Sequence, residues 1–221
     1  MYPHPVTILT FFWPTLLAAP LYSSINPLTS VLLDVAPASS SCPNAPIASQ
    51  CRTAGQAASA IQASFERYNI TNANEKAALI SLMAYETGSF RYNENVYPGR
   101  PGQGTRNMQM IGYNVLYAGS IPNLAGELES IIKTSSGIDA AEDLSAEQMD
   151  AVRDLLTADD VLDFGLAAWF LSTQCDSDVR DTLQTGGVLG WMQYITQCVG
   201  TVVADRQTMF DVALLALRKS A

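Results

Sequence analysis

The feature that most constrains the fold of this chain is a helical pattern in residues 74–88, which reads NEKAALISLMAYETG. Its small and apolar side chains repeat at the spacing of one helix face: Ala77, Ile80, Met83 and Ala84. Asn72 is a candidate N-cap, and Glu75 is placed to complete a capping box. Gly88 is the residue type that ends helices in a left-handed turn. The pattern therefore predicts a helix whose last turn carries Glu86.

Helical spacing recurs along most of the remaining chain. The segments with this pattern are residues 52–68, 122–132, 161–173, 189–199 and 203–217. Only residues 90–110, which are rich in glycine and polar side chains, leave room for a short β-hairpin. We therefore expect a single, mainly α-helical domain with a small loop or β-hairpin region beside a cleft.

The first 41 residues differ in composition from the rest of the chain. Residues 6–19 are almost entirely apolar and lead into small residues, as in a secretory signal peptide. The alternative is a membrane anchor, but Pro14 interrupts the run, and the run is short for a bilayer. The Ser-, Pro- and Ala-rich segment that follows indicates a disordered leader or pro-segment. The expected divisions are a signal peptide, this leader and one folded domain, at residues 1–19, 20–41 and 42–221.

Four cysteines follow the apolar segment: Cys42, Cys51, Cys175 and Cys198. An even number in a chain with a signal peptide favours two disulfide bonds. Three pairings are possible, and we prefer Cys42–Cys51 with Cys175–Cys198, because each of these bonds closes a local loop. A zinc site is the alternative, but the gaps of 9 and 23 residues do not bring ligands close together in the chain. We therefore expect two disulfides, no metal and an extracellular location.

Charge and residue usage exclude several classes of function. The formal net charge is −9, and no basic stripe suits nucleic acid. Residues 139–163 hold nine carboxylates against one arginine, which indicates the solvated face of two helices. The single histidine, His4, lies in the signal segment, which excludes serine–histidine and cysteine–histidine catalysis from the mature chain. No glycine-rich phosphate loop occurs. We expect a monomer with no cofactor and no nucleic-acid or membrane partner.

Glu86 is the strongest candidate for chemistry. An apolar helix disfavours a charged carboxylate through desolvation, and the negative end of the helix dipole adds to this effect. Both features favour the protonated form of Glu86, which is the form that a general acid needs. The alternative is a glutamate that merely faces solvent at the end of a helix.

Three short motifs accompany this residue in order: Tyr85-Glu86-Thr87, Tyr97-Pro98-Gly99-Arg100 and Gly104-Thr105-Arg106-Asn107-Met108-Gln109. A helix that ends in Glu-Thr, followed by a glycine turn into Met-Gln, resembles goose-type lysozymes and lytic transglycosylases of the lysozyme-like superfamily. The Tyr-Pro-Gly-Arg step is similar to the family 19 plant-type chitinases, with fainter echoes in residues 167–173 and 204–210. The chain also resembles secreted fungal muramidases. The resemblance covers residues 57–217 and implies a lysozyme-like helical domain with glycoside hydrolase activity.

The resemblance also implies roles for individual residues. Glu86 would be the general acid, and Glu94 would be a second catalytic carboxylate or an exposed loop residue with no role. The residues expected to bind the sugar are Tyr97, Thr105, Gln109, Tyr113 and Asn114. Core packing or turn capping is the alternative for the aromatic and amide residues among them. Arg100 and Arg106 would bind an acidic group of the substrate or pair with the acidic helices.

Peptidoglycan and chitin share the backbone that this superfamily cleaves, so both are candidate partners. The negative net charge favours neutral chitin, whereas the short segment between Glu86 and Gln109 favours peptidoglycan. We expect a secreted muramidase that cleaves the β-1,4 bonds of peptidoglycan. The alternatives are a chitinase of the family 19 type and a catalytically inactive secreted glycan-binding protein.

One further pattern, Asn69-Ile70-Thr71, is an N-glycosylation sequon between two expected helices. It fits an exposed turn of a secreted protein, although so short a pattern also arises by chance.

Overall fold

The computed structural model describes residues 26–132, 141 and 143–220, together with Met1. The α-helices are α1 (Leu28–Val35), α2 (Ala54–Arg67), α3 (Ala73–Glu86), α4 (Ile111–Gly119), α5 (Ala125–Ile132), α6 (Ala146–Thr157), α7 (Asp160–Thr173), α8 (Ser177–Thr185), α9 (Gly187–Gln193) and α10 (Arg206–Lys219). Short 3-10 or π-helical turns lie at Pro37–Ser40, Pro122–Leu124 and Tyr194–Cys198. The prediction of a mainly α-helical protein is confirmed.

Helix α7 lies at the centre of the fold, because both of its faces are buried. One apolar cluster contains Phe164, Ala167, Ala168 and Leu171. The other contains Leu166, Trp169 and Phe170. A helix that is apolar all round needs neighbours on both sides. The predicted core helix at residues 161–173 is therefore confirmed, and it joins two parts of the core.

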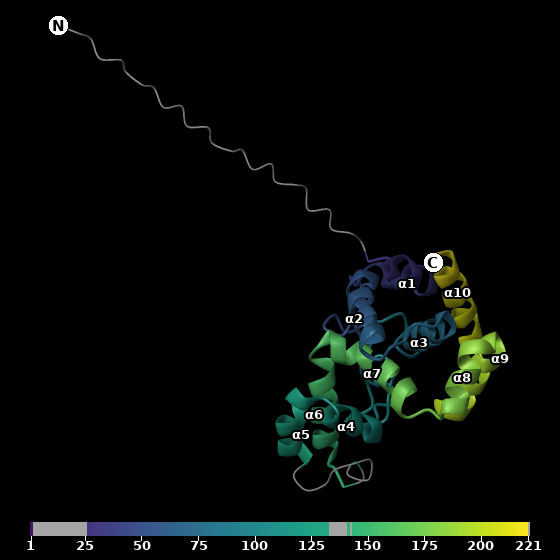
Figure 1. Cartoon of the computed structure of the whole chain (residues 1–221). Coiled ribbons are helices and arrows are strands. Elements are labelled where there is room, and N and C mark those ends of the chain that lie inside the picture. The colour runs from purple at the N-terminus through teal and green to yellow at the C-terminus, as the bar shows by residue number, and fades with distance from the viewer. Residues whose placement is uncertain (2–25, 133–140, 142, 221) are drawn as a thin grey trace.

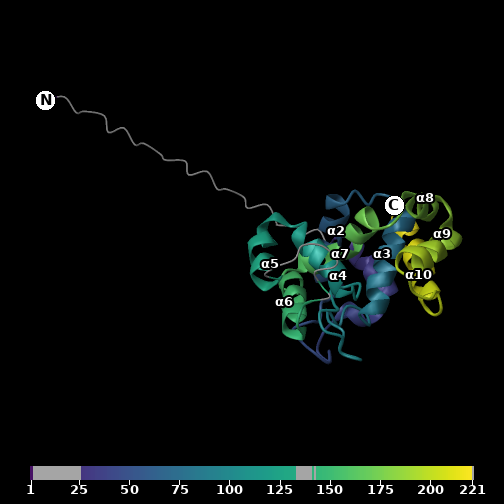
Figure 2. The same ribbon diagram turned by 90° about the horizontal axis from the view of Figure 1, so that it is seen from below.

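Two groups of helices flank α7. In Figures 1 and 2, α4, α5 and α6 gather at one end of the molecule, and α8, α9 and α10 gather at the other. Between them, α2 packs against α7, and α3 packs against α10. Helix α1 packs on both α2 and α10, so the first and last helices are neighbours (Figure 1).

Helix α3 begins and ends close to the predicted positions. Asn72 is the N-cap and accepts a hydrogen bond from a backbone N–H of the first turn at 2.8 Å. Glu75 does not complete a capping box, because it is buried and pairs with Arg180 of α8 at 2.6 Å. The helix ends at Glu86, and Gly88 follows with a φ of 56°. The start of α3 is thus tied to α8, while its end borders an irregular loop.

Helix α1 lies within the segment that we expected to be disordered, residues 20–41. Its buried side chains are Leu28, Val31, Leu32 and Val35. These residues share one helix face and pack against α2 and α10, so this part of the segment belongs to the folded core. The predicted signal peptide, residues 1–19, lies outside the described residues apart from Met1. None of the helices in the described part is both long and apolar enough to cross a membrane.

The loop between α3 and α4 does not form the predicted β-hairpin. Its β pairing is limited to two isolated antiparallel bridges, Glu94 with Gly104 and Gly104 with Gln109. Thr105 and Met108 have φ values of 61° and 48°, which strand residues do not adopt. These left-handed residues break the alternation of the chain, and an irregular loop takes the place of the hairpin.

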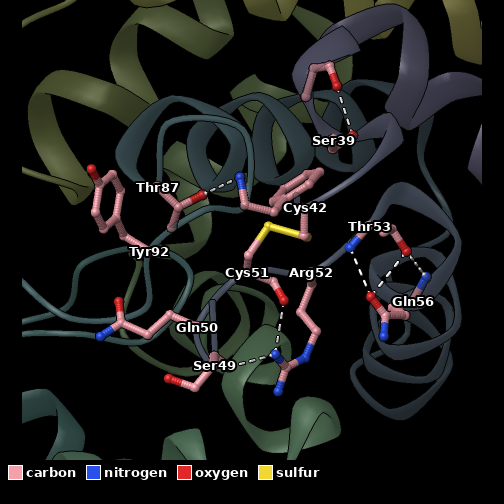
Figure 3. The surroundings of a disulfide bond; sticks show 12 residues. Ser39, Cys42, Ser49, Gln50, Cys51, Arg52, Thr53, Gln56, Thr87 and Tyr92 are labelled. Atoms are coloured by element: carbon pink, nitrogen blue, oxygen red, sulfur yellow. Dashed lines mark hydrogen bonds between the residues drawn. A yellow bond between two sulfur atoms is a disulfide. The ribbon is translucent and has the colours of Figure 1, made fainter. Parts of the chain in front are cut away.

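Both preferred disulfides are present. Cys42–Cys51 closes the loop before α2 (Figure 3), and Cys175–Cys198 joins the end of α7 to the π-helical turn after α9. Cys175 and Cys198 pack against both apolar clusters. No cysteine in the described part is free. The pairing that the sequence favoured is confirmed.

Candidate functional site

A polar cleft with a volume of about 390 Å³ lies between the end of α3 and the irregular loop. Its lining residues are Glu86, Tyr92, Glu94, Asn95, Val96, Tyr97, Gln103 and Met108. This volume falls in the range of small-molecule sites. Of the residues singled out from the sequence, Glu86, Glu94 and Tyr97 come together here.

The loop that forms the cleft is held from beneath by Arg106, whose side chain is fully buried. Its Nε lies 2.7 Å from Oδ2 of Asp163 on α7. Its other nitrogens donate hydrogen bonds to the carbonyls of Gln50, Phe90 and Tyr92 at 2.8, 3.1 and 3.1 Å. A guanidinium offers five donors in one plane, so a single side chain can join several segments. Of the two roles expected for Arg106, pairing with an acidic helix is the one observed.

Asp163 is the buried acidic partner in this arrangement. Its Oδ2 also accepts a hydrogen bond from the Asn93 amide at 3.2 Å, whereas its Oδ1 has no partner among the described residues. Burial raises the pKa of Asp163 to about 6, although Arg106 and Asn93 oppose the shift. Burial likewise lowers the pKa of Arg106. The prediction of a solvated acidic face is therefore wrong at Asp163, because its spacing to Ala167 places it on a buried face of α7.

Glu94 is held by groups from two other segments. Its Oε1 accepts a hydrogen bond from the Gln50 amide, and its Oε2 lies 3.4 Å from Arg153 of α6. Gln50 precedes Cys51, so the first disulfide keeps this segment beside the loop (Figure 3). Arg153 also pairs with Asp150 at 2.7 Å. Glu94 is thus an anchored carboxylate at the wall of the cleft.

Glu86 faces a positive charge. Its Oε1 accepts two hydrogen bonds from Arg206 of α10, at 3.1 and 2.8 Å. The same guanidinium lies 4.3 Å from the centre of the Tyr85 ring. The apolar surroundings that we expected for Glu86 are replaced by an ion pair, because α10 brings a cation from a distant part of the sequence.

The other predicted sugar-binding residues support the loop or the core. Asn114 is fully buried, and its amide donates to two backbone carbonyls at 2.7 and 3.3 Å. Thr105 is also fully buried, and its hydroxyl donates to the preceding carbonyl at 2.6 Å. Tyr113 packs edge-on against Phe170, with ring centres 4.9 Å apart. The Gln109 side chain accepts a hydrogen bond from the next backbone N–H at 3.1 Å. None of these four predicted residues lines the cleft.

Sequence reasoning missed the pair of amides that braces the cleft. Asn95 donates to the Gln103 side chain at 2.6 Å, and Gln103 donates to the Met108 carbonyl at 2.9 Å. The missed lining residues Tyr92 and Val96 lie in the same loop. The available signal was the concentration of polar and aromatic residues in residues 91–103, but no hydrophobic period shows which side chains of an irregular loop contact one another.

A second hollow, of about 860 Å³, lies between α5, α6 and the start of α7. Its apolar lining includes Ile121, Leu124, Ile131, Leu155 and Leu162. Exposed carboxylates of Glu127, Asp154 and Asp159 also border it. No residue predicted as part of a site lines this hollow.

Comparisons with known proteins give one match to part of a curated protein. No protein-family model and no solved structure matches it. Among curated proteins, it is 45% identical over 161 residues to a bifunctional dioxygenase–epoxy alcohol synthase of Fusarium oxysporum (strain Fo5176). The matched region spans 73% of this chain but 12% of that protein. The similarity therefore concerns one short part of a much longer relative.

This match corrects the functional prediction. The name of the relative describes oxidative chemistry, and no comparison supports a lysozyme-like glycoside hydrolase, a chitinase or a glycan-binding protein. The prediction of a muramidase is therefore wrong: it rested on short motifs, and several of the residues expected to form the site have structural roles instead. Thr105 and Asn114 are buried supports of the loop, and Arg106 is its internal anchor. The predicted partners and secretion are not tested by these findings.

A dioxygenase commonly holds oxygen on a haem, a non-haem iron or a copper ion, whose protein ligands include histidine or thiolate. The four cysteines of this chain are in disulfides, and His4 lies outside the described residues. Within the described part, no group of three His, Cys, Asp or Glu side chains could hold a metal ion. The described residues therefore offer no three-ligand site of these types for a non-haem iron or copper ion.

Proposed function

We propose that this chain is a helical binding module that serves a dioxygenase–epoxy alcohol synthase by holding an oxygenated small molecule in the polar cleft. The observation that carries the proposal is the 45% identity to part of such an enzyme, in a chain whose described residues contain no cluster of three His, Cys, Asp or Glu side chains for a metal ion. In this proposal, other parts of the enzyme activate oxygen, and this chain binds the oxygenated small molecule.

The names of the two activities define the chemistry of the ligand. A dioxygenase adds both atoms of O2 to its substrate, and an epoxy alcohol carries one oxygen as an epoxide and one as a hydroxyl. The epoxide spans two carbons of a former carbon–carbon double bond, so the precursor is an unsaturated compound, and we take its carbon chain to be the apolar part of the ligand. A site for such a product needs acceptors for the hydroxyl, donors for the epoxide oxygen and apolar contacts for the carbon chain.

The polar cleft provides these three kinds of contact. Glu94 is an acceptor that is already anchored in place. The phenols of Tyr92 and Tyr97 offer donors, and Val96 offers an apolar surface. The amide pair of Asn95 and Gln103 keeps the loop in shape before a ligand arrives. A preorganised site of this kind loses less entropy on binding.

The experiment is calorimetric titration of the purified full-length chain with an epoxy alcohol prepared from a long-chain allylic alcohol. The parent allylic alcohol, which lacks the epoxide, is the comparison ligand. We expect the epoxy alcohol to bind about fivefold more tightly, since one added hydrogen bond is worth on the order of 1 kcal/mol. Tyr97→Ala and Gln103→Ala should weaken binding, whereas the exposed control Leu189→Ala on α9 should not.

Two results would count against this proposal. Binding that responds to Leu155→Ala, and not to Tyr97→Ala, would place the ligand in the hollow beside α5. Oxygen uptake by the purified chain with an unsaturated substrate would show that the chain carries oxidative chemistry itself. An oxygen electrode measures this directly.

A further inference from the structure

The sequence contains one N-glycosylation sequon, Asn69-Ile70-Thr71. It occupies the turn between α2 and α3. Asn69 adopts a left-handed conformation with a φ of 52°, which asparagine tolerates better than most residues. The side chains of Asn69 and Thr71 are exposed, whereas Ile70 between them is 2% exposed. The turn thus presents both residues that the modification requires.

The turn is fixed in this orientation by its own contacts. The Ile70 N–H donates to the Phe65 carbonyl at 2.8 Å, and the Ile70 side chain belongs to the apolar core. Beside Asn69 lies a hollow of about 210 Å³, bordered by Gln62, Glu66 and Lys76. Their polar side chains surround open space in which a first sugar residue can lie without displacing the core.

The two disulfides point to the compartment in which this modification takes place. Disulfides form in oxidising compartments such as the secretory pathway, where N-glycosylation also occurs. All four cysteines of the chain are paired in the structure. This observation is independent of the sequon, and it comes from other parts of the chain.

We propose that Asn69 carries an N-linked glycan. In the reaction, the Asn69 amide nitrogen forms a bond to the anomeric carbon of an oligosaccharide held on a lipid diphosphate. The bond from that carbon to the phosphate oxygen breaks, the amide loses one proton, and the lipid diphosphate leaves. Glu86 lies at the opposite end of the 14-residue helix α3, about 20 Å along its axis. The point of attachment is therefore distant from the polar cleft.

The test is expression of the full chain in a yeast secretory host, followed by mass spectrometry of the peptide that contains Asn69. Treatment with an N-glycosidase in heavy-oxygen water converts a glycosylated asparagine to labelled aspartate. We expect the label at Asn69 in the wild type and in Thr71→Ser, which keeps the hydroxyl of the sequon. Asn69→Gln and Thr71→Ala should both abolish it.

Unmodified wild-type chain overturns the proposal, whether it is recovered from the medium or retained in the cells. Equal labelling of the wild type and Thr71→Ala overturns it as well, because the label would then arise without a sequon. Peptide mass is the readout in every arm. The result is therefore separate from any outcome of the ligand titrations.

Discussion

Arg106 organises a cleft that it does not line. Its guanidinium holds Asp163 of α7 and three carbonyls from two other segments, and it does so with no exposed surface. A buried ion pair gains stability only when its remaining hydrogen-bonding groups are also satisfied. The carbonyls supply partners for Arg106, whereas Oδ1 of Asp163 has no partner among the described residues. The conformation of the loop that lines the cleft therefore depends on the buried guanidinium of Arg106.

Arg106→Met should lower the free energy of unfolding by about 3–5 kcal/mol, because it leaves Asp163 buried without its cation. The matched control is Arg52→Met, which breaks a pair with Asp160 whose side chains are 22% and 35% exposed. Solvent screens that pair, so we expect a loss of about 1 kcal/mol or less. Urea denaturation followed by circular dichroism measures both variants. Equal losses would contradict the central role of Arg106.

The sequence predicted part of the cleft, and the missing part has a physical cause. The position of Glu86 follows from a local helical period, which is visible within fifteen residues. Its partner Arg206 lies 120 residues away, and only the packing of α10 on α3 brings them together. The same holds for Arg106 and Asp163, which are 57 residues apart. Local patterns identify charged residues, but they do not identify which charges meet.

At the scale of elements, prediction succeeded where a helix carries its own pattern. Helix α7 is apolar all round and 14 residues long, so its existence and burial follow from sequence alone. Helix α1 has 8 residues in a Ser- and Pro-rich segment. So short a helix is unstable alone and forms because α2 and α10 cover it. The irregular loop was mistaken for a hairpin because left-handed residues such as Thr105 leave no signature in hydrophobic alternation.

Two helical glycines give a matched test of packing between elements. A Cβ at Gly126 in the first turn of α5 would meet nothing within 4 Å, so Gly126→Ala should stabilise the protein by up to about 1 kcal/mol through helix propensity. A Cβ at Gly190 of α9 would overlap the Thr182 carbonyl of α8. Gly190→Ala should therefore destabilise by about 1–3 kcal/mol despite the same gain in propensity. Thermal denaturation compares them, and changes of the same sign would contradict the close approach of α8 and α9.

At the scale of the whole molecule, the buried pair makes stability depend on pH. The pKa of Asp163 rises from 3.8 to about 6 on folding, chiefly through burial. Between these values the folded state binds more protons than the unfolded state. The contribution of Asp163 to the stability of the folded state is fully present below pH 3.8, and it is lost as the pH rises through about 6. The shift is worth roughly 3 kcal/mol at 1.36 kcal/mol per pKa unit.

We therefore expect the titration of Asp163 to lower the free energy of unfolding by up to about 3 kcal/mol between pH 4 and pH 7. Urea titrations at a series of pH values measure the trend. The Asp163→Asn variant has no titrating group at this position, so its free energy of unfolding should lack this part of the pH dependence. The other carboxylates contribute equally to the pH dependence of both proteins. Parallel curves for the two proteins would rule out the assignment to Asp163. If the variant does not fold, carboxyl-detected NMR titration of the wild type gives the same pKa.

The contact between α1 and α10 has a consequence for how such a unit can be built into larger proteins. Leu28 at the start of α1 and Leu217 near the end of α10 border one shared hollow, so the chain enters and leaves the fold at neighbouring points. A unit with adjacent entry and exit can be spliced into a surface loop of a host protein without stretching that loop. Such a unit therefore adds a folded domain to a host protein while the two ends of the host loop stay close together.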